Sequence, residues 1–154
     1  MEIDSFFRID GVFVLASELA RPVPDENYIE GAIEITVEGR RVLSCDHWDY
    51  IDQLWSYLLD GITAISEGRS FSTFLPDQPV QVCFEPQDAE QVQIRVQDNG
   101  VIIASVDREL FLLSMLDACR EFFLHLPKVA PGKTKLSKQA LARIEYVWQR
   151  SQDP

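Results

Sequence analysis

The chain has 154 residues, of which 46% are hydrophobic and 25% are charged, and its formal net charge at pH 7 is −11. These values are typical of one globular domain over residues 1–154, and they exclude a disordered chain and a membrane-spanning protein, which needs about 20 consecutive apolar residues. The negative charge, concentrated in the lysine-free residues 1–100, disfavours nucleic acid and anionic lipid and favours a basic protein partner, although solubility alone would also explain it.

The first half of the chain predicts several strands and one helix. Residues 5–19 are rich in Phe, Val and Ile and should form one long strand, or two that turn at Asp10-Gly11. Apolar and polar residues alternate over 28–38, as in a strand with one buried face, and residues 41–44 should return beside it. Residues 46–67 repeat apolar side chains at helical spacing, and Asp46 is placed to cap that helix.

The second half predicts four strands and two helices. Strands are expected at 70–75, 79–85, 91–97 and 101–106, and Asp98-Asn99-Gly100 predicts a tight turn between the last two. A helix should run over 108–126, with Asp107 as its cap and Pro127 at its end. A basic loop from Lys128 to Lys135 should then lead to a last helix, which Ser137 caps and which extends to about Gln149.

Together these elements indicate an α+β fold. Strands that follow one another through short turns pair in antiparallel fashion. We therefore predict an antiparallel sheet of about six strands, with the two main helices packed on one face and a C-terminal helix. Alternation along three of the strands indicates that the other sheet face is open or only thinly covered.

The sequence contains no motif typical of catalysis or of metal binding. Cys45, Cys83 and Cys119 are widely spaced in or beside apolar segments, which is typical of reduced cysteines that pack in a core. Asp46 and His47 could bind a metal together with Asp49, but capping and the helix dipole account for the aspartates. Nucleophile and phosphate-loop motifs are lacking, so we expect no enzyme, no metal and no cofactor.

Two groups of side chains are the candidate partner-binding residues. Glu30, Glu34 and Glu38 are four residues apart, so they should form an acidic row on the exposed strand face, although an ordinary solvated face has the same pattern. The predicted helix start combines aromatic side chains with carboxylates, as protein interfaces do, although these aromatics also suit packing under neighbouring segments. The second group consists of Asp46, Trp48, Asp49, Tyr50 and Asp52.

The chain resembles the immunity proteins of bacterial toxin systems in its size, acidity and general pattern. The two groups of candidate partner-binding residues are the parts of the chain that carry this resemblance. The resemblance implies a cytoplasmic protein that neutralises one toxin by binding it, with acidic side chains replacing the phosphates of a nuclease substrate. The first residues lack the features of a signal peptide, which also favours the cytoplasm. One alternative is an accessory or adaptor protein, including a homodimer in which Lys128–Lys138 contacts the acidic half of a second copy. Another is a small-molecule-binding domain, with a pocket between the open sheet face and the last helix.

Overall fold

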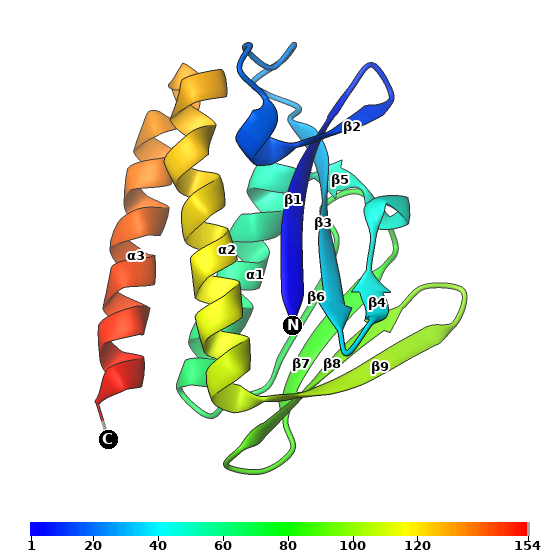
Figure 1. Cartoon of the computed structure of the whole chain (residues 1–154), viewed down its shortest axis with the longest axis vertical. Helices are drawn as coiled ribbons and strands as arrows, with labels where there is room; N and C mark the ends of the chain where they lie inside the picture. Colours follow the sequence, from blue (N-terminus) through cyan, green and yellow to red (C-terminus); the bar gives the residue numbers. More distant parts are fainter. Residues whose placement is uncertain (154) are drawn as a thin grey trace.

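A computed structural model describes residues 1–153 of the chain (Figure 1). Within these residues, the strands form two antiparallel sheets, and three helices pack beside them. The predicted α+β class is confirmed, including the C-terminal helix.

The first sheet has the strand order β2-β1-β3-β4, and β5 also pairs with β3. Its strands are β1 (Glu2–Ile9), β2 (Val12–Leu15), β3 (Glu30–Val37), β4 (Arg40–Leu43) and β5 (Asp49–Tyr50). Asp10 and Gly11 both have positive φ and form the tight turn between β1 and β2, so residues 5–19 contain two strands and not one. β2 pairs only with residues 6–9, and residues 2–5 pair only with β3.

The second sheet has the strand order β6-β7-β8-β9. Its strands are β6 (Phe71–Phe74), β7 (Gln81–Pro86), β8 (Gln91–Gln97) and β9 (Val101–Asp107). The predicted turn at residues 98–100 joins β8 to β9. The strands divide between two sheets because β9 approaches β4 without pairing with it; instead, Arg40 donates a hydrogen bond to the carbonyl oxygen of Ile103. The register of the β3–β4 pair also shifts between Ile35 and Thr36.

The helices form two further layers (Figure 1). Helices α1 (Ile51–Ser66) and α2 (Arg108–Val129) pack against the strands, and α3 (Thr134–Gln152) packs on their far side. Large buried side chains fill the space between helices and sheets, among them Phe7, Trp55 and Phe122. The small-molecule alternative required a pocket between the open sheet face and the last helix. Because α3 lies away from the sheets, it does not enclose such a pocket.

Helix α1 starts later than predicted. Residues 45–50 do not continue it; they form a 3-10 turn, η2 (Cys45–His47), and then strand β5. The Ser44 side chain accepts a hydrogen bond from the main chain of Asp46, and the ring of His47 accepts one from the main chain of Ser44. The prediction that Asp46 caps α1 is therefore wrong, because Ser44 and His47 cap a separate turn.

In the basic segment Lys128–Lys138, the end of α2 and the start of α3 differ from the prediction. Asp107 caps α2 as predicted. The predicted end at Pro127 is wrong, because the helix continues through it to Val129. The proline removes one helical hydrogen bond, and the burial of Val129 compensates for this loss of stability. A 3-10 turn, η3 (Pro131–Lys133), then leads directly into α3, so Ser137 is not its cap and the basic residues lie mostly in helices. Among residues 1–153, no helix has both the length and the apolarity to cross a membrane.

Candidate functional site

Three residues of the predicted second group, Asp46, Trp48 and Tyr50, lie beside the start of β3, on a surface that we call the aromatic-acidic patch. Two hollows of about 340 and 360 Å³ adjoin there and share Glu30. The patch comprises the aromatic residues Tyr28, Trp48 and Tyr50, the pair Arg8 and Glu30 between them, and the rim carboxylates Asp25, Asp46 and Asp77. These residues come from β1, from β3 and its preceding loop, and from the segments before α1 and β7.

Pairing of β5 with β3 brings the patch together. Tyr50 lies opposite Glu30 in the register, and the rings of Tyr28 and Tyr50 have centroids 5.6 Å apart. Gly31, beside Glu30, is required by close packing: a Cβ there would lie 2.2 Å from the carbonyl oxygen of Phe6. The glycine therefore lets β1 and β3 approach each other directly beneath the patch.

Arg8 links the two sides of the patch. Its guanidinium lies 4.0 Å from the ring centroid of Trp48, and it forms a 2.7 Å ion pair with Glu30. The ring of Trp48 is half-buried under this cation. Stacking on an aromatic face and pairing with a carboxylate together fix the side chain of Arg8. Arg8 and Glu30 thus form a rigid polar centre between the aromatic rings.

Asp49 supports the patch from below and is not part of its surface, where we had expected it. The residue is buried, and its carboxylate accepts hydrogen bonds from the main-chain N–H groups of Tyr50, Asp77 and Gln78 at 2.7, 2.9 and 3.0 Å. The amide of Gln78 also donates to the carbonyl oxygen of Trp48. A buried carboxylate with several main-chain donors is a structural clamp, and this one attaches the β6–β7 loop to the start of α1.

Asp52 is also buried, which corrects its expected place on the partner surface. Its carboxylate lies 3.2 Å from the ammonium of Lys133, at the end of η3. Asp52 does lie in the first turn of α1, as the helix-dipole interpretation expected, but that interpretation could not reveal its burial beside Lys133. Asp52 joins α1 to the start of α3 and lies outside the patch.

The acidic row is shorter and less negative than predicted. Glu30 and Glu34 lie on the outer face of β3, where Glu34 pairs with Arg41 at 3.1 Å as Glu30 pairs with Arg8. Glu38 leaves the row because it lies in the β3–β4 turn with a φ of 50°. Both carboxylates on β3 are therefore paired with an arginine. The carboxylates of this region that lack an ion-pair partner in the described residues are those at the rim of the patch.

Four patch residues, Arg8, Asp25, Tyr28 and Asp77, were missed by the sequence analysis. They come from three segments that lie far apart in the sequence, and only the strand register and the Asp49 clamp bring these segments together. The sequence held one signal for Arg8: it lies between the apolar residues Phe7 and Ile9, and this alternation predicts that its side chain faces outward from the strand.

Two ionisable groups in or beside the patch, the Tyr50 hydroxyl and the Cys45 thiol, have raised pKa values, which favour their neutral forms. Partial burial, followed by the nearby carboxylate of Asp77, raises the pKa of the Tyr50 hydroxyl, which therefore stays protonated at neutral pH. Burial and the carboxylate of Glu34 likewise raise the pKa of the Cys45 thiol. In the described part of the chain, no three His, Cys, Asp or Glu side chains gather as metal ligands do. Comparisons with protein-family models, with curated proteins and with solved structures found no match to this chain.

Proposed function

We propose that this chain is a non-catalytic immunity protein that neutralises a cognate bacterial toxin by binding it through the aromatic-acidic patch. The observation that carries the proposal is the combination of half-exposed aromatic rings with carboxylates that have no ion-pair partner among residues 1–153. Tyr28 is 61% exposed, and the rim aspartates Asp25, Asp46 and Asp77 are unpaired. Aromatic rings around a fixed arginine, with polar groups at the rim, are the composition of an interface hot spot.

The charges favour a basic partner. The rim carboxylates would attract a positive surface at a distance and raise the association rate, and the rings would then be buried at contact. A nuclease has such a positive surface where it binds phosphates. Carboxylates at the rim would occupy the positions of those phosphates and block access to the substrate.

The proposal is tested by a pull-down, in which a tagged form of the protein captures its partners from the native cell lysate at low and at moderate salt. Mass spectrometry then identifies the bound proteins. We expect one basic partner in a fixed ratio, captured less well as salt rises. Purified partner should lose its toxic activity when this protein is added. A partner that stays active in the complex would contradict the proposal.

Matched tyrosine variants locate the binding surface. Tyr28→Ala removes an exposed ring of the patch, and Tyr146→Ala removes one of similar exposure, 55%, from α3. The proposal expects Tyr28→Ala to weaken capture about tenfold or more, as hot-spot residues do, and Tyr146→Ala to leave it unchanged. Equal effects of the two substitutions would place the interface elsewhere.

A homodimeric adaptor is the second candidate, because α2 also exposes apolar side chains. Leu110 and Leu113 are 41% and 47% exposed on its first turns. Exposed apolar clusters are typical of interaction surfaces. Sedimentation of the purified protein separates the candidates: the immunity proposal expects a monomer, whereas a dimer that Leu113→Lys dissociates would favour the adaptor.

A further inference from the structure

The first strand of the chain has an open edge. β2 pairs with β1 only as far as Phe6, after which the chain leaves the sheet through a 3-10 turn, η1 (Ala16–Glu18). Ile9 and Val12 flank a two-residue turn, so their main-chain groups hydrogen-bond to each other across β1 and β2. Along β1, every second residue directs its N–H and C=O groups to the same side of the strand as Ile9 does, which is the side of β2. Ile3 and Ser5 therefore direct their N–H and C=O groups to a side on which no strand within residues 1–153 pairs with them.

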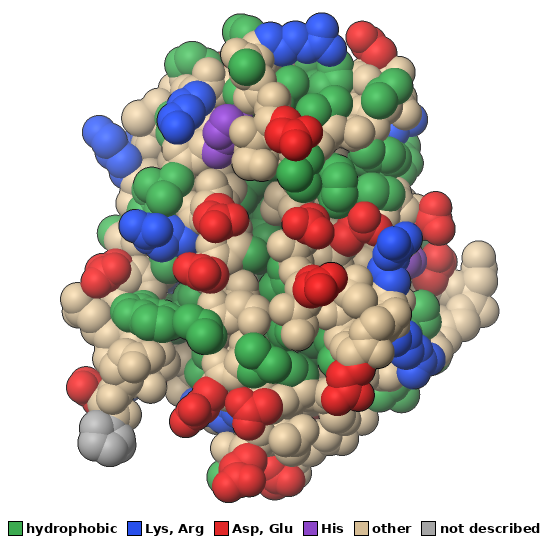
Figure 2. Space-filling view, in the orientation of Figure 1, with side chains coloured by type: hydrophobic (Ala, Val, Ile, Leu, Met, Phe, Trp, Pro, Cys, Tyr) green, Lys and Arg blue, Asp and Glu red, His purple; other side chains and the backbone are tan. Residues whose placement is uncertain are grey.

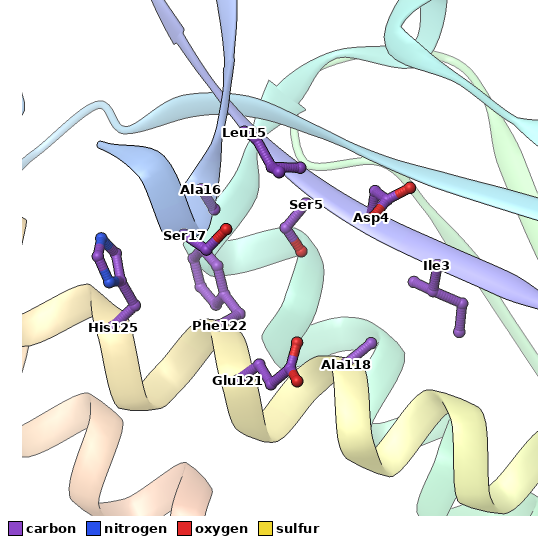
Figure 3. Close-up of a pocket in the computed structure, with 10 residues that line it drawn as sticks. All are labelled: Ile3, Asp4, Ser5, Leu15, Ala16, Ser17, Ala118, Glu121, Phe122 and His125. Carbon is purple, nitrogen blue, oxygen red and sulfur yellow. The ribbon is translucent and has the colours of Figure 1, made fainter. Parts of the chain in front are cut away.

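A groove follows this open edge, between β1 and α2 (Figure 3). Its floor includes Ala118 and Phe122 of α2, and the side chains of Ser5 and Glu121 point into the gap. The ring of His125, at one end, is 2.9 Å from the carbonyl oxygen of Leu19 and thereby attaches η1 to α2. The cavity is about 90 Å³, which is too small for a metabolite but sufficient for an apolar side chain of a peptide.

The walls of the groove are acidic. Asp4 lines it from the strand and Glu121 from the helix, and both are exposed without an ion-pair partner in the described residues. Figure 2 shows acidic side chains over α2 and over the strands of the first sheet, on either side of this region. The charge of the groove therefore complements a basic segment.

A second copy of the chain does not suit the same edge. If two β1 edges paired in antiparallel fashion about a twofold axis, the carboxylates of Glu2 and Asp4 from the two copies would face each other across the new pair. Acidic side chains on an open edge prevent this kind of self-association. They do not prevent pairing with a strand of opposite charge.

We propose that residues 2–5 of β1 and the adjacent face of α2 receive an extended basic segment of a partner protein as an added strand of the first sheet. Main-chain hydrogen bonds to Ile3 and Ser5 hold the segment. Its apolar side chains enter the groove above Phe122, and its alternate lysine or arginine side chains lie beside Asp4. The groove is separate from the aromatic-acidic patch, so either proposal can fail without the other.

The test is an NMR titration of the ¹⁵N-labelled protein with a blocked hexapeptide of alternating lysine and valine. We expect the amide signals of Ile3 and Ser5 to move downfield and their exchange with solvent to slow, because new hydrogen bonds form there. A peptide of alternating glutamate and valine should not bind. The lysine peptide with its alternate amides N-methylated keeps its charge but loses its donors, and should bind much more weakly. No binding of the lysine peptide, or equal binding of the methylated one, would overturn the proposal.

Charge variants complete the test. The pair Asp4→Asn and Glu121→Gln should weaken binding of the lysine peptide about fivefold, since each exposed charge pair contributes only modestly to the affinity. The pair Glu90→Gln and Glu109→Gln removes the same charge from exposed sites outside the groove and should change the affinity little. Equal weakening by the two pairs would show general attraction to an acidic protein and would exclude a groove.

Discussion

The carboxylate of Asp52 lies 3.2 Å from the ammonium of Lys133, and the two side chains differ sharply in exposure, at 4% and 27%. The aspartate is enclosed in the protein, whereas the lysine still reaches solvent. The ion pair connects α1 to the turn that precedes α3, and so holds the outermost helix in place. Its two partners should therefore respond differently to substitution.

Lys133→Met should destabilise the protein more than Asp52→Asn. The first change leaves a buried carboxylate without its partner, which costs about 3 kcal/mol, whereas the second frees a lysine that water can solvate, which costs about 1 kcal/mol. Urea denaturation of both variants measures the free energies of unfolding. An equal loss, or a larger one for Asp52→Asn, would contradict a buried-carboxylate role for Asp52.

Asp49→Ala should cost about 3 kcal/mol, because it leaves several main-chain donors without their acceptor. The exposed Asp46→Ala is the control and should change the free energy of unfolding by about 0.5 kcal/mol or less, since surface substitutions rarely do more. Urea denaturation measures both variants. Amide signals of residues 76–79 should also broaden or shift in Asp49→Ala alone, as the β6–β7 loop detaches. An unchanged loop would refute the clamp.

Much of the fold could be predicted from the sequence, because its signals are local. Alternation identified β8, the turn at residues 98–100 fixed its hairpin with β9, and Asp107 marked the start of α2. The division into two sheets could not be predicted, since it depends on how β4 and β9 meet, and these strands are far apart in the sequence. The late start of α1 was missed because η2 and β5 use residues that also suit a helix start.

The candidate site was predictable only in part. Trp48 and Tyr50 lie in the patch as expected, because aromatic residues among carboxylates are a local feature. Asp49 and Asp52 belong to the same short segment but turn inward, and composition cannot distinguish an exposed carboxylate from a clamped one. Arg8 reaches Trp48 only through the β1–β3 register, a non-local relationship that one sequence does not contain.

Cys45 should react slowly with iodoacetamide at pH 7 although it is partly exposed. Burial and the charge of Glu34 raise the pKa of its thiol, so less of the reactive thiolate forms at a given pH than in the unfolded chain. Its rate should rise as the pH is raised through that pKa. Cys119 is buried, with a raised pKa, and should react only after unfolding in urea. Mass spectrometry of alkylated peptides between pH 7 and 10 measures both. Rapid modification of Cys45 at pH 7 would contradict this.

Gly31→Ala should destabilise the protein severely, by about 3 kcal/mol or more, because its Cβ would meet the main chain of Phe6, which cannot move without separating β1 from β3. Gly100→Ala is the control, since a Cβ there meets nothing within 4 Å, and its effect should be small. Thermal unfolding followed by circular dichroism compares the two. A mild effect at Gly31 would mean that β1 and β3 can separate beneath the patch at little cost, which would contradict their close packing.

Charge reversal at Glu30 and at Glu34, four residues apart on β3, distinguishes the patch from the acidic row first predicted. Glu30→Lys places a cation beside Arg8 at the centre of the patch, so it should weaken partner binding about tenfold or more through both repulsion and loss of the ion pair. Glu34→Lys makes the same change of charge on the same strand face but outside the patch, where the carboxylate pairs with Arg41. It should reduce only the association rate, by the general loss of negative charge. Surface plasmon resonance of the captured partner at two salt concentrations measures both rates. If the two reversals weakened binding equally, the outer strand face as a whole would be the interface, and the aromatic rings beside Arg8 would have no special part in it.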